Sequence, residues 1–425
     1  MKQLLIHNAR VIDPSQDLDA QVDILVSNGY IMQIGVGLTC SEADILDASG
    51  LVCAPGLVDM HVHLRDPGQT HKEDIFTGCQ AAAAGGVTSI ACMPNTSPVC
   101  DSPDVVRYIV EQSAKAAARV YPVAAATTSL KSAAINDFEQ LKKAGAVAVS
   151  DDGRPVETAD MMERVLKLAK SCGLAVVSHC EETSLVRGGI MNEGSVSQQL
   201  GVPGICHAAE DVATAREIAL AAATGCPVHI CHVSSGGSVA LIRDARRRGV
   251  PVTGETAPHY FALTDEKLLA RDADYRMNPP LRTEKDRHMI IEGLKDGTLT
   301  AIATDHAPHT PDEKKNFVKA PNGSIGLETS LAVGITYLVH EHHLSLSELI
   351  GCMSTNPANI LGIPAGSLKP GCAADMVLFD VNEKWIVDPA HMHSKSCNTP
   401  FKGMELYGRV HYTLLGGKTV YSLER

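Results

Sequence analysis

The stretch LVDMHV, residues 57–62, is a short, mostly apolar run with a histidine at its last position but one, and it is the first of eight similar runs along the chain. The others lie at 87–92, 120–126, 146–150, 174–178, 228–232, 250–254 and 300–304. Continuous apolar strands that alternate with helices form parallel sheets covered by those helices. Eight repeats of this unit therefore predict an α/β fold, a closed (β/α)8 barrel.

The segments between the runs carry helix start and stop signals. Ser102 followed by Pro103 opens one helix, and Gly145 closes another. Thr158 precedes a stretch that ends at Gly173. Its apolar residues recur at helical spacing: Met162, Val165, Leu166 and Ala169. We therefore expect amphipathic helices between the barrel strands.

The two ends of the chain have a different character. Asp23–Val26, the Asn28-Gly29 turn and Tyr30–Ile34 predict a hairpin, and residues 367–425 contain similar strand pieces. Neither end is large enough to bury a core alone. We predict a barrel domain at 54–366 and one small composite β domain built from residues 1–53 and 367–425.

Composition limits the class of protein. The 425 residues carry 37 basic and 49 acidic side chains, a net charge of −12, which disfavours a nucleic-acid partner. We find no signal peptide and no membrane-spanning run, so no membrane partner is expected. The thirteen cysteines are scattered and odd in number, which favours a reducing compartment. We expect a cytoplasmic enzyme.

Metal-capable side chains stand at the ends of the predicted strands. His61 and His63 are two apart on a strand, so both imidazoles point to one face. Other candidates follow later runs: Asp151, His179, His232 and Asp305. Each one alone has an ordinary structural explanation, such as a helix cap or a buried histidine. Because the strand ends of a barrel meet at one rim, their coincidence favours a shared metal site.

The donor types suggest which metal is held. Imidazole nitrogen with carboxylate oxygen and no thiolate suits Zn²⁺ or a similar divalent ion, one or two per chain. Six ligands exceed what one tetrahedral catalytic ion needs, which favours a two-ion site with a bridging carboxylate. From its place after the fourth run, Asp151 is the expected bridge.

At this point the sequence resembles a known family. HVHLRDPG at 61–68, MPNT at 93–96, SDDG at 150–153, MNPPLR at 277–282 and ATDHAPH at 303–309 are similar to the signature segments of type I dihydroorotases, cyclic amidohydrolases of pyrimidine biosynthesis. The resemblance implies reversible cyclisation of carbamoyl-aspartate to dihydroorotate. It also implies that His61, His63 and Asp305 hold one ion and His179 and His232 the other, with Asp151 between them.

The resemblance further implies a mechanism. A hydroxide shared by two ions would attack the ring amide carbonyl, since coordination lowers the pKa of water from about 16 toward roughly 7. Asp305 would act as general base and then as general acid. Related hydantoinases and dihydropyrimidinases often carry a carboxylated lysine after the fourth strand. Here Lys142 and Lys143 precede Gly145 and belong to the helix, which favours the dihydroorotase branch.

Substrate recognition is expected close to the metal ligands. Arg65 lies two residues beyond His63, so its guanidinium can form paired hydrogen bonds to a substrate carboxylate. The family pattern adds further polar contacts: His63, Asn95, Asn278 and His309, with backbone groups near Asn322 and Gly323. We term residues 306–326 the substrate loop. It either closes over the substrate or simply connects the barrel to its next helix.

Two other interpretations remain open. A catalytically silent homologue could serve as a structural partner of aspartate transcarbamoylase, but the presence of all six candidate ligands disfavours this. A related enzyme could act on a hydantoin, allantoin or dihydropyrimidine, but Arg65 with Asn95 favours a substrate with an exocyclic carboxylate. We also expect a homodimer, with a transcarbamoylase as a further possible partner.

Overall fold

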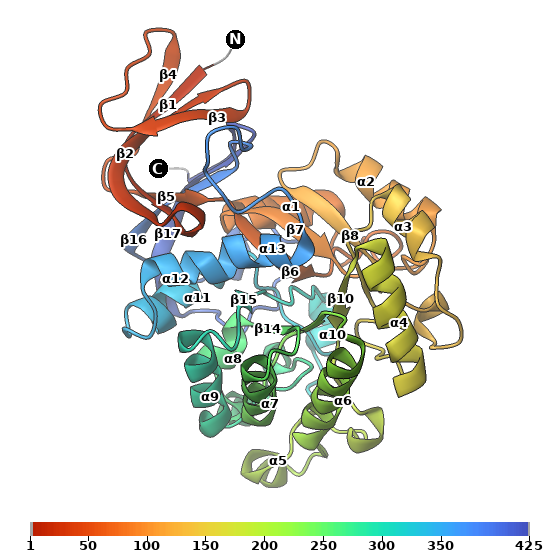
Figure 1. Ribbon diagram of the computed structural model, residues 1–425. Coiled ribbons are helices and arrows are strands. Elements are labelled where there is room, and N and C mark those ends of the chain that lie inside the picture. The colour runs from red at the N-terminus through yellow and green to blue at the C-terminus, as the bar shows by residue number, and fades with distance from the viewer. Residues whose placement is uncertain (1–2, 424–425) are drawn as a thin grey trace.

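The computed structural model describes residues 3–423 and has the expected barrel. Eight parallel strands are paired in the order β15–β14–β13–β10–β9–β8–β7–β6. A bridge between Val62 and His306 and a bond from His63 N to His306 O (2.8 Å) join the two edges. The strands are β6 (Leu57–Val62), β7 (Val87–Cys92), β8 (Arg119–Ala125), β9 (Ala148–Ser150), β10 (Ala175–Ser178), β13 (Val228–Ile230), β14 (Val252–Thr256) and β15 (Ala301–Ile302). Helices surround them (Figure 1).

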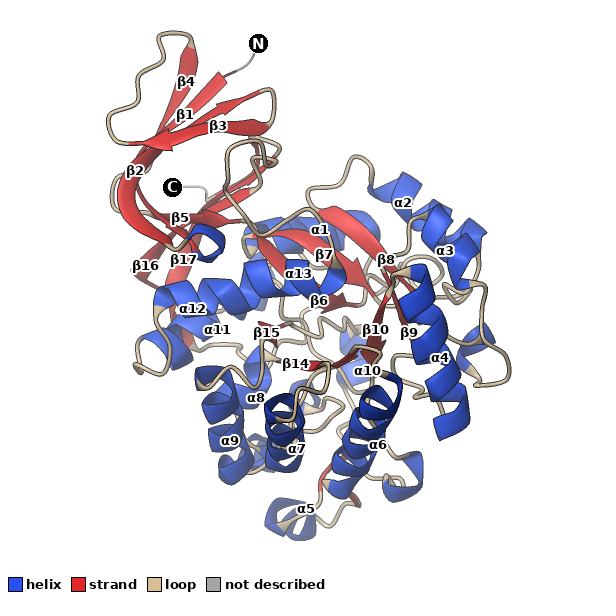
Figure 2. Cartoon of the chain, in the orientation of Figure 1, coloured by secondary structure: helices blue, strands red, loops and turns tan. Residues whose placement is uncertain are grey.

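The covering helices begin and end where the start and stop signals in the sequence predict. Thr158 Oγ1 accepts from Met161 N (3.2 Å) at the start of α4, and Gly173 closes that helix with a φ of 65°. Figure 2 shows these helices outside the strands. They are α1 (Ile75–Ala84), α2 (Pro103–Ser113), α3 (Phe138–Ala144), α4 (Ala159–Cys172), α6 (Ala208–Thr224), α7 (Gly236–Arg247), α9 (Glu284–Lys295), α11 (Ser330–Gly334), α12 (Leu346–Ile350) and α13 (Asn356–Leu361).

Shorter elements fill the connections above the barrel. They are α5 (Ser195–Leu200), α8 (Pro258–Ala262), α10 (Pro311–Lys314), β11 (Met191–Asn192) and β12 (Gly204–Ile205). Between residues 3 and 423, no helix combines the length and apolar character needed to cross a bilayer.

All eight predicted runs overlap a barrel strand, but two strands stop two residues earlier than expected. The runs at 228–232 and 300–304 form strand only to Ile230 and Ile302. Beyond them, His232 has a φ of 34° and Asp305 a φ of 50°. These left-handed backbone conformations are incompatible with an extended strand, and both residues lie at the rim of the barrel.

Side chains of the barrel strands alternate between two apolar layers. Val58, Ala148 and Val177 belong to the cluster inside the barrel. Their neighbours Leu57, Val149 and Val176 pack into the larger cluster beneath the helices. This alternation decides which polar residues at the strand ends face the barrel axis.

The second sheet combines strands from both ends of the chain. Its order is β18–β17–β16–β5–β1–β2–β3, with β4 beside β1. The strands are β1 (Gln3–Asp13), β2 (Leu18–Ser27), β3 (Tyr30–Gly35), β4 (Ala43–Asp47), β5 (Val52–Pro55), β16 (Met376–Ile386), β17 (Glu405–Leu415) and β18 (Lys418–Ser422). The expected β2–β3 hairpin is present. The predicted boundary between residues 53 and 54 falls inside β5, so we propose that the small domain extends to Pro55.

Candidate metal centre

Imidazoles and carboxylates gather at the carboxyl ends of five barrel strands. His61 and His63 come from the end of β6, and the others follow later strands: Asp152 after β9, His179 after β10, His232 after β13 and Asp305 after β15. All of these residues are at most 7% exposed. The barrel therefore collects side chains that are up to 244 positions apart in the sequence, from His61 to Asp305, at one place.

A β-bulge in β6 lets His61, and His63 directly after the strand, face the barrel axis. Asp59 pairs with Ile90, and the next pair is Val62 with Cys92. Between these two pairs β6 therefore contains one residue more than β7. Met60 already belongs to the interior cluster. Without the extra residue, strict alternation would send His61 to the opposite face. The bulge therefore creates the His-x-His pair that points inward.

The structure brings Asp152 to this cluster in place of Asp151, which corrects the position predicted for the bridge. Alternation from Ala148, inside the barrel, places residues 150 and 152 inward and 151 outward. Asp151 instead accepts hydrogen bonds from Thr127 N (2.9 Å) and Thr127 Oγ1. Burial raises the pKa of Asp151. Asp151 therefore holds a loop beside the barrel and stands apart from the histidines.

Asp152 lies between two groups of histidines. Its Oδ1 is 3.3 Å from His61 Nε2, 3.7 Å from His179 Nδ1 and 3.8 Å from His232 Nε2. Its Oδ2 is 3.6 Å from His63 Nε2. The groups His61–His63–Asp152 and Asp152–His179–His232 each have the compactness of a metal site, and they share this carboxylate. The arrangement fits a bridged pair of cations.

Asp305 completes the first group. Its Oδ1 lies 3.1 Å from His63 Nε2 and 3.7 Å from His61 Nε2. In the second group, His179 Nδ1 and His232 Nε2 are 2.8 Å apart. His61 Nε2 is fully buried without a hydrogen-bond partner. An unsatisfied buried nitrogen aimed at two carboxylates is costly unless another group binds it, so the donor set fits a metal ion.

Buried partners fix the opposite side of both histidine rings on β6. His61 Nδ1 donates to Glu255 Oε1 (3.0 Å), and His63 Nδ1 donates to Asn95 Oδ1 (2.8 Å). Glu255 is fully buried on β14 and also accepts from His229 Nε2 (3.2 Å). These bonds leave each Nε2 free to face the cluster. Sequence reasoning missed Glu255, because its partner His61 lies 194 positions away in the chain.

The facing charges keep the carboxylates ionised. Burial opposes the charge of Asp152, but His61 and His232 hold its pKa well below the ordinary value. Burial likewise opposes the charge of Asp305, but His63 and His61 lower its pKa. Burial raises the pKa of the nearby Cys231 thiol to about 12. The carboxylates are therefore available as ligands, whereas Cys231 stays protonated at neutral pH.

A cavity of about 210 Å³ opens onto the cluster, and all residues predicted to contact substrate line it. They are His63, Arg65, Asn95, Asn278, His309, Asn322 and Gly323. Arg65 is 9% exposed, and its guanidinium donates to a backbone carbonyl, Pro308 O (3.2 Å), rather than to a carboxylate. Its Nη2 lies 3.4 Å from His309 Nε2. Burial and Arg65 lower the pKa of His309 to about 3, so that imidazole is neutral at working pH.

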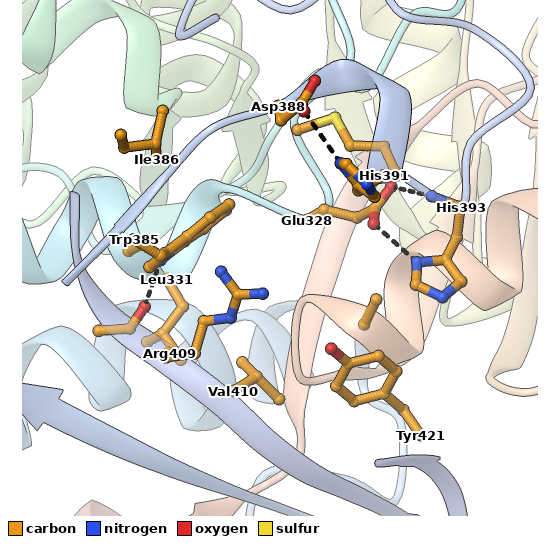
Figure 3. Close-up of a pocket in the computed structure, with 14 residues that line it drawn as sticks. Glu328, Leu331, Trp385, Ile386, Asp388, His391, His393, Arg409, Val410 and Tyr421 are labelled. Carbon is orange, nitrogen blue, oxygen red and sulfur yellow. Dashed lines mark hydrogen bonds and ion pairs between the residues drawn. The ribbon is translucent and has the colours of Figure 1, made fainter. Parts of the chain in front are cut away.

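A second cavity, of about 170 Å³, lies between the barrel and the composite sheet and has different chemistry (Figure 3). His393 Nδ1 is paired with Glu328 Oε2 (3.0 Å), and His391 Nδ1 with Asp388 Oδ2 (2.9 Å). Arg409 stacks over the Trp385 ring at 4.6 Å. Among the described residues, the groups compact enough to hold a metal lie in the barrel. The barrel cavity is therefore the candidate active site.

The fold and this cluster define a barrel hydrolase with a site for divalent cations. Comparison with known proteins identifies the family to which it belongs. The model of the Amidohydrolase family matches residues 52–420. The chain belongs to the amidohydrolase family.

Particular relatives narrow the comparison. A dihydroorotase from Geobacter sulfurreducens is 53% identical over 422 residues, covering 99% of both chains. A dihydroorotase from Geobacter metallireducens is 52% identical over 421 residues, covering 98% of this chain and 99% of the relative.

Solved structures of a hydantoinase and a dihydropyrimidinase share the fold. An L-hydantoinase from Arthrobacter aurescens superimposes with a TM-score of 0.89 at 25% identity, covering 100% of this chain and 98% of the other. A dihydropyrimidinase from Brevibacillus agri has a TM-score of 0.86 at 27% identity, covering 99% of this chain and 95% of the other. The barrel architecture is therefore shared with enzymes whose sequences are much less similar than those of the dihydroorotases.

Proposed function

We propose that this protein is a dihydroorotase of the type I branch, which interconverts carbamoyl-aspartate and dihydroorotate in pyrimidine synthesis. The observation that carries the proposal is the buried guanidinium of Arg65, which lines the same cavity as the histidine–carboxylate cluster. A buried cation beside a hydrolytic centre suits a cyclic amide that bears a carboxylate. Whole-chain identity of about half to dihydroorotases supports the same substrate.

We propose Zn²⁺ as the resident metal, with two ions per chain. His61, His63 and Asp305 would hold one ion and His179 and His232 the other, with Asp152 shared between them. When bound, such ions lower the pKa of water and polarise a carbonyl oxygen. The buried, unpartnered His61 Nε2 supports this assignment.

Asp305 is the proposed proton carrier. Its carboxylate lines the cavity and is held ionised, so it can take a proton from the water that attacks the ring carbonyl. The same carboxyl then protonates the ring nitrogen as the C–N bond breaks. In the reverse direction, Asp305 removes a proton from the attacking carbamoyl nitrogen and returns it to the departing oxygen. One residue thus serves both directions.

The remaining cavity residues would hold the ring. Arg65 would bind the substrate carboxylate through its fork, with Asn95 and the neutral His309 beside it. Asn278 donates to Glu181 Oε1 (3.0 Å), which leaves its own Oδ1 without a partner to accept from a ring N–H. Asn322 and Gly323 would offer backbone groups. This set of contacts positions the amide next to Asp305.

Two alternatives fit less well. The hydantoinase and dihydropyrimidinase neighbours share the fold, but the Asp151-Asp152 pair after β9 supplies an aspartate where those relatives are expected to use a lysine. A catalytically silent homologue would lack part of the ligand set. Here the histidines and carboxylates converge on two overlapping groups, which favours an active enzyme.

The test combines metal analysis, spectrophotometric assay of dihydroorotate and a pair of adjacent variants. We expect zinc near two ions per chain and measurable turnover. Asp152→Asn should lower zinc content and activity by at least about 100-fold, because it removes the shared charge. Asp151→Asn should keep both within about threefold and lose only stability, since its bonds go to Thr127. Zinc-loaded protein that opens hydantoin but leaves dihydroorotate intact would contradict the proposal.

The proposed setting of the enzyme is cytoplasmic. We propose a homodimer, with association with an aspartate transcarbamoylase as a further possibility drawn from the family resemblance. Light scattering of the purified protein, alone and mixed with a transcarbamoylase, tests both. A monomer at micromolar concentration would contradict the dimer.

A further inference from the structure

The connection between β16 and β17, residues 387–404, leaves the composite sheet and crosses to the mouth of the barrel. It passes the second cavity, where His393 of the connection is bonded to Glu328 of the barrel domain (Figure 3). Five residues further on, Asn398 is 3% exposed and lies within the barrel domain's own loops. A segment of the small sheet therefore reaches the substrate cavity.

Asn398 binds both arms of the substrate loop. Its Oδ1 accepts from His309 N (3.1 Å), and its Nδ2 donates to Ala307 O (3.2 Å) on the same arm. The same Nδ2 donates to Gly323 O (3.0 Å) on the opposite arm, where Ile325 N donates to Asn398 O (3.1 Å). One buried residue thus makes four hydrogen bonds to the loop backbone.

The two arms carry part of the proposed substrate contacts. His309 Nε2 and Asn322 O lie 2.9 Å apart, so the arms touch at the cavity wall. Lys314 Nζ donates to Pro321 O (3.1 Å) and Gly323 O (2.9 Å), which joins the two arms a second time. These contacts tie the two arms of the loop to each other and to Asn398 at the cavity wall.

The same connection also forms hydrogen bonds to Lys72 and Glu73, on the other side of the site. Lys395 N and Ser394 Oγ donate to Glu73, and Ser396 Oγ donates to Lys72 O (2.8 Å). Glu73 is fully buried and lies 3.4 Å from the Nε2 of His306, the neighbour of Asp305. Residues 70–74 follow the segment that carries Arg65. The connection therefore contacts both the substrate loop and the segment that follows Arg65.

We propose that the β16–β17 connection is a positioning element of the substrate pocket, with Asn398 as its positioning residue. Asn398 sets His309, Asn322 and Gly323 against Arg65, and among the residues that the structure describes its hydrogen bonds go to the loop and not to a proposed metal ligand. The identity of the substrate rests on the proposed function, whereas the fastening of the loop does not. The inference gives the C-terminal sheet a role in recognition as well as in folding.

The test compares Asn398→Ala with Asn192→Ala. Both asparagines are 3% exposed, and Asn192 bonds to Asp265 and Arg282, away from the substrate loop. For Asn398→Ala we expect the KM for dihydroorotate to rise about tenfold, with kcat within about threefold and zinc content unchanged. Trypsin should cut the variant after the exposed Lys315 and Lys319 about tenfold faster. Asn192→Ala should show neither change.

Other results decide the matter as well. Unchanged KM or an unchanged rate of loop cleavage in Asn398→Ala overturns the proposal. If the native protein lacks dihydroorotase activity, the proposed function fails, while the cleavage rate still tests whether Asn398 fastens the loop. If Asn398→Ala does not fold, hydrogen exchange of the native protein replaces it. The amides of His309 and Ile325 should then exchange as slowly as barrel-strand amides, and rapid exchange overturns the proposal.

Discussion

Replacing Glu255 by Gln tests how much the hydrogen bond between Glu255 and His61 contributes to metal binding. The carboxylate accepts from His61 Nδ1 (3.0 Å) through Oε1 and from His229 Nε2 (3.2 Å) through Oε2, and it is fully buried. An amide has the same shape but only one acceptor oxygen, so one of the two imidazoles loses a charge-assisted bond.

The expected cost follows from that bond. A hydrogen bond to a charged group contributes about 1.5–3 kcal/mol, and loss of an outer partner of a metal-bound histidine lowers metal affinity by about 10- to 100-fold. We expect a decrease in zinc affinity of that size in Glu255→Gln. The assay is competition for zinc with a chromophoric chelator, followed at equilibrium.

The matched control is Glu210→Gln. Glu210 is 3% exposed and accepts from Ser234 N (3.0 Å), Ser235 N (3.1 Å) and Arg282 Nη2 (3.4 Å). This variant should lose stability and keep zinc affinity within about twofold. Equal zinc affinity in Glu255→Gln and the native protein would refute the reasoning, since the bond to His61 would then contribute nothing to ligand orientation.

Further predictions concern the cavity. Asp305→Asn should abolish turnover and leave the fold intact by circular dichroism, and near-native turnover would remove Asp305 as proton carrier. Arg65→Lys keeps the charge but loses the fork, so the KM for dihydroorotate should rise about tenfold or more while zinc content stays constant; an unchanged KM argues against this contact. Native His309 takes up a proton only near a pKa of about 3, because burial and Arg65 disfavour its charge, whereas the unfolded chain takes it up near 6.5. The unfolding free energy should therefore fall as pH drops below 6.5, and urea titrations of His309→Gln should show a shallower fall unless His309 is irrelevant to acid stability.

The sequence predicts the barrel well because the fold depends on repeated patterns. Each predicted run overlaps a strand, and the helix signals at Thr158 and Gly173 have the expected geometry. Apolar alternation and helix caps are local properties, so one chain suffices to detect them. The presence of a small sheet made from both termini could also be predicted from strand pieces that were too few to form a core separately.

The site was less predictable where one residue of register matters. Asp151 and Asp152 are adjacent and chemically identical, and only the inward parity of Ala148 distinguishes them. Glu255 and Asn398 were missed for another reason. Their partners are distant in sequence, His61 for the first and the substrate loop for the second. Such pairings arise from tertiary packing, which no local pattern encodes.

The position of β5 in the composite sheet has a consequence for synthesis of the chain. β5 lies between β1, made first, and β16, made after residue 375. Until residues 376–386 have left the ribosome, one edge of β5 has no neighbouring strand, and β5 consists of the apolar residues Val52–Pro55. An open apolar edge recruits other chains. Chains truncated before β16 should therefore be prone to aggregation, and rapid synthesis of β16 protects the enzyme against it.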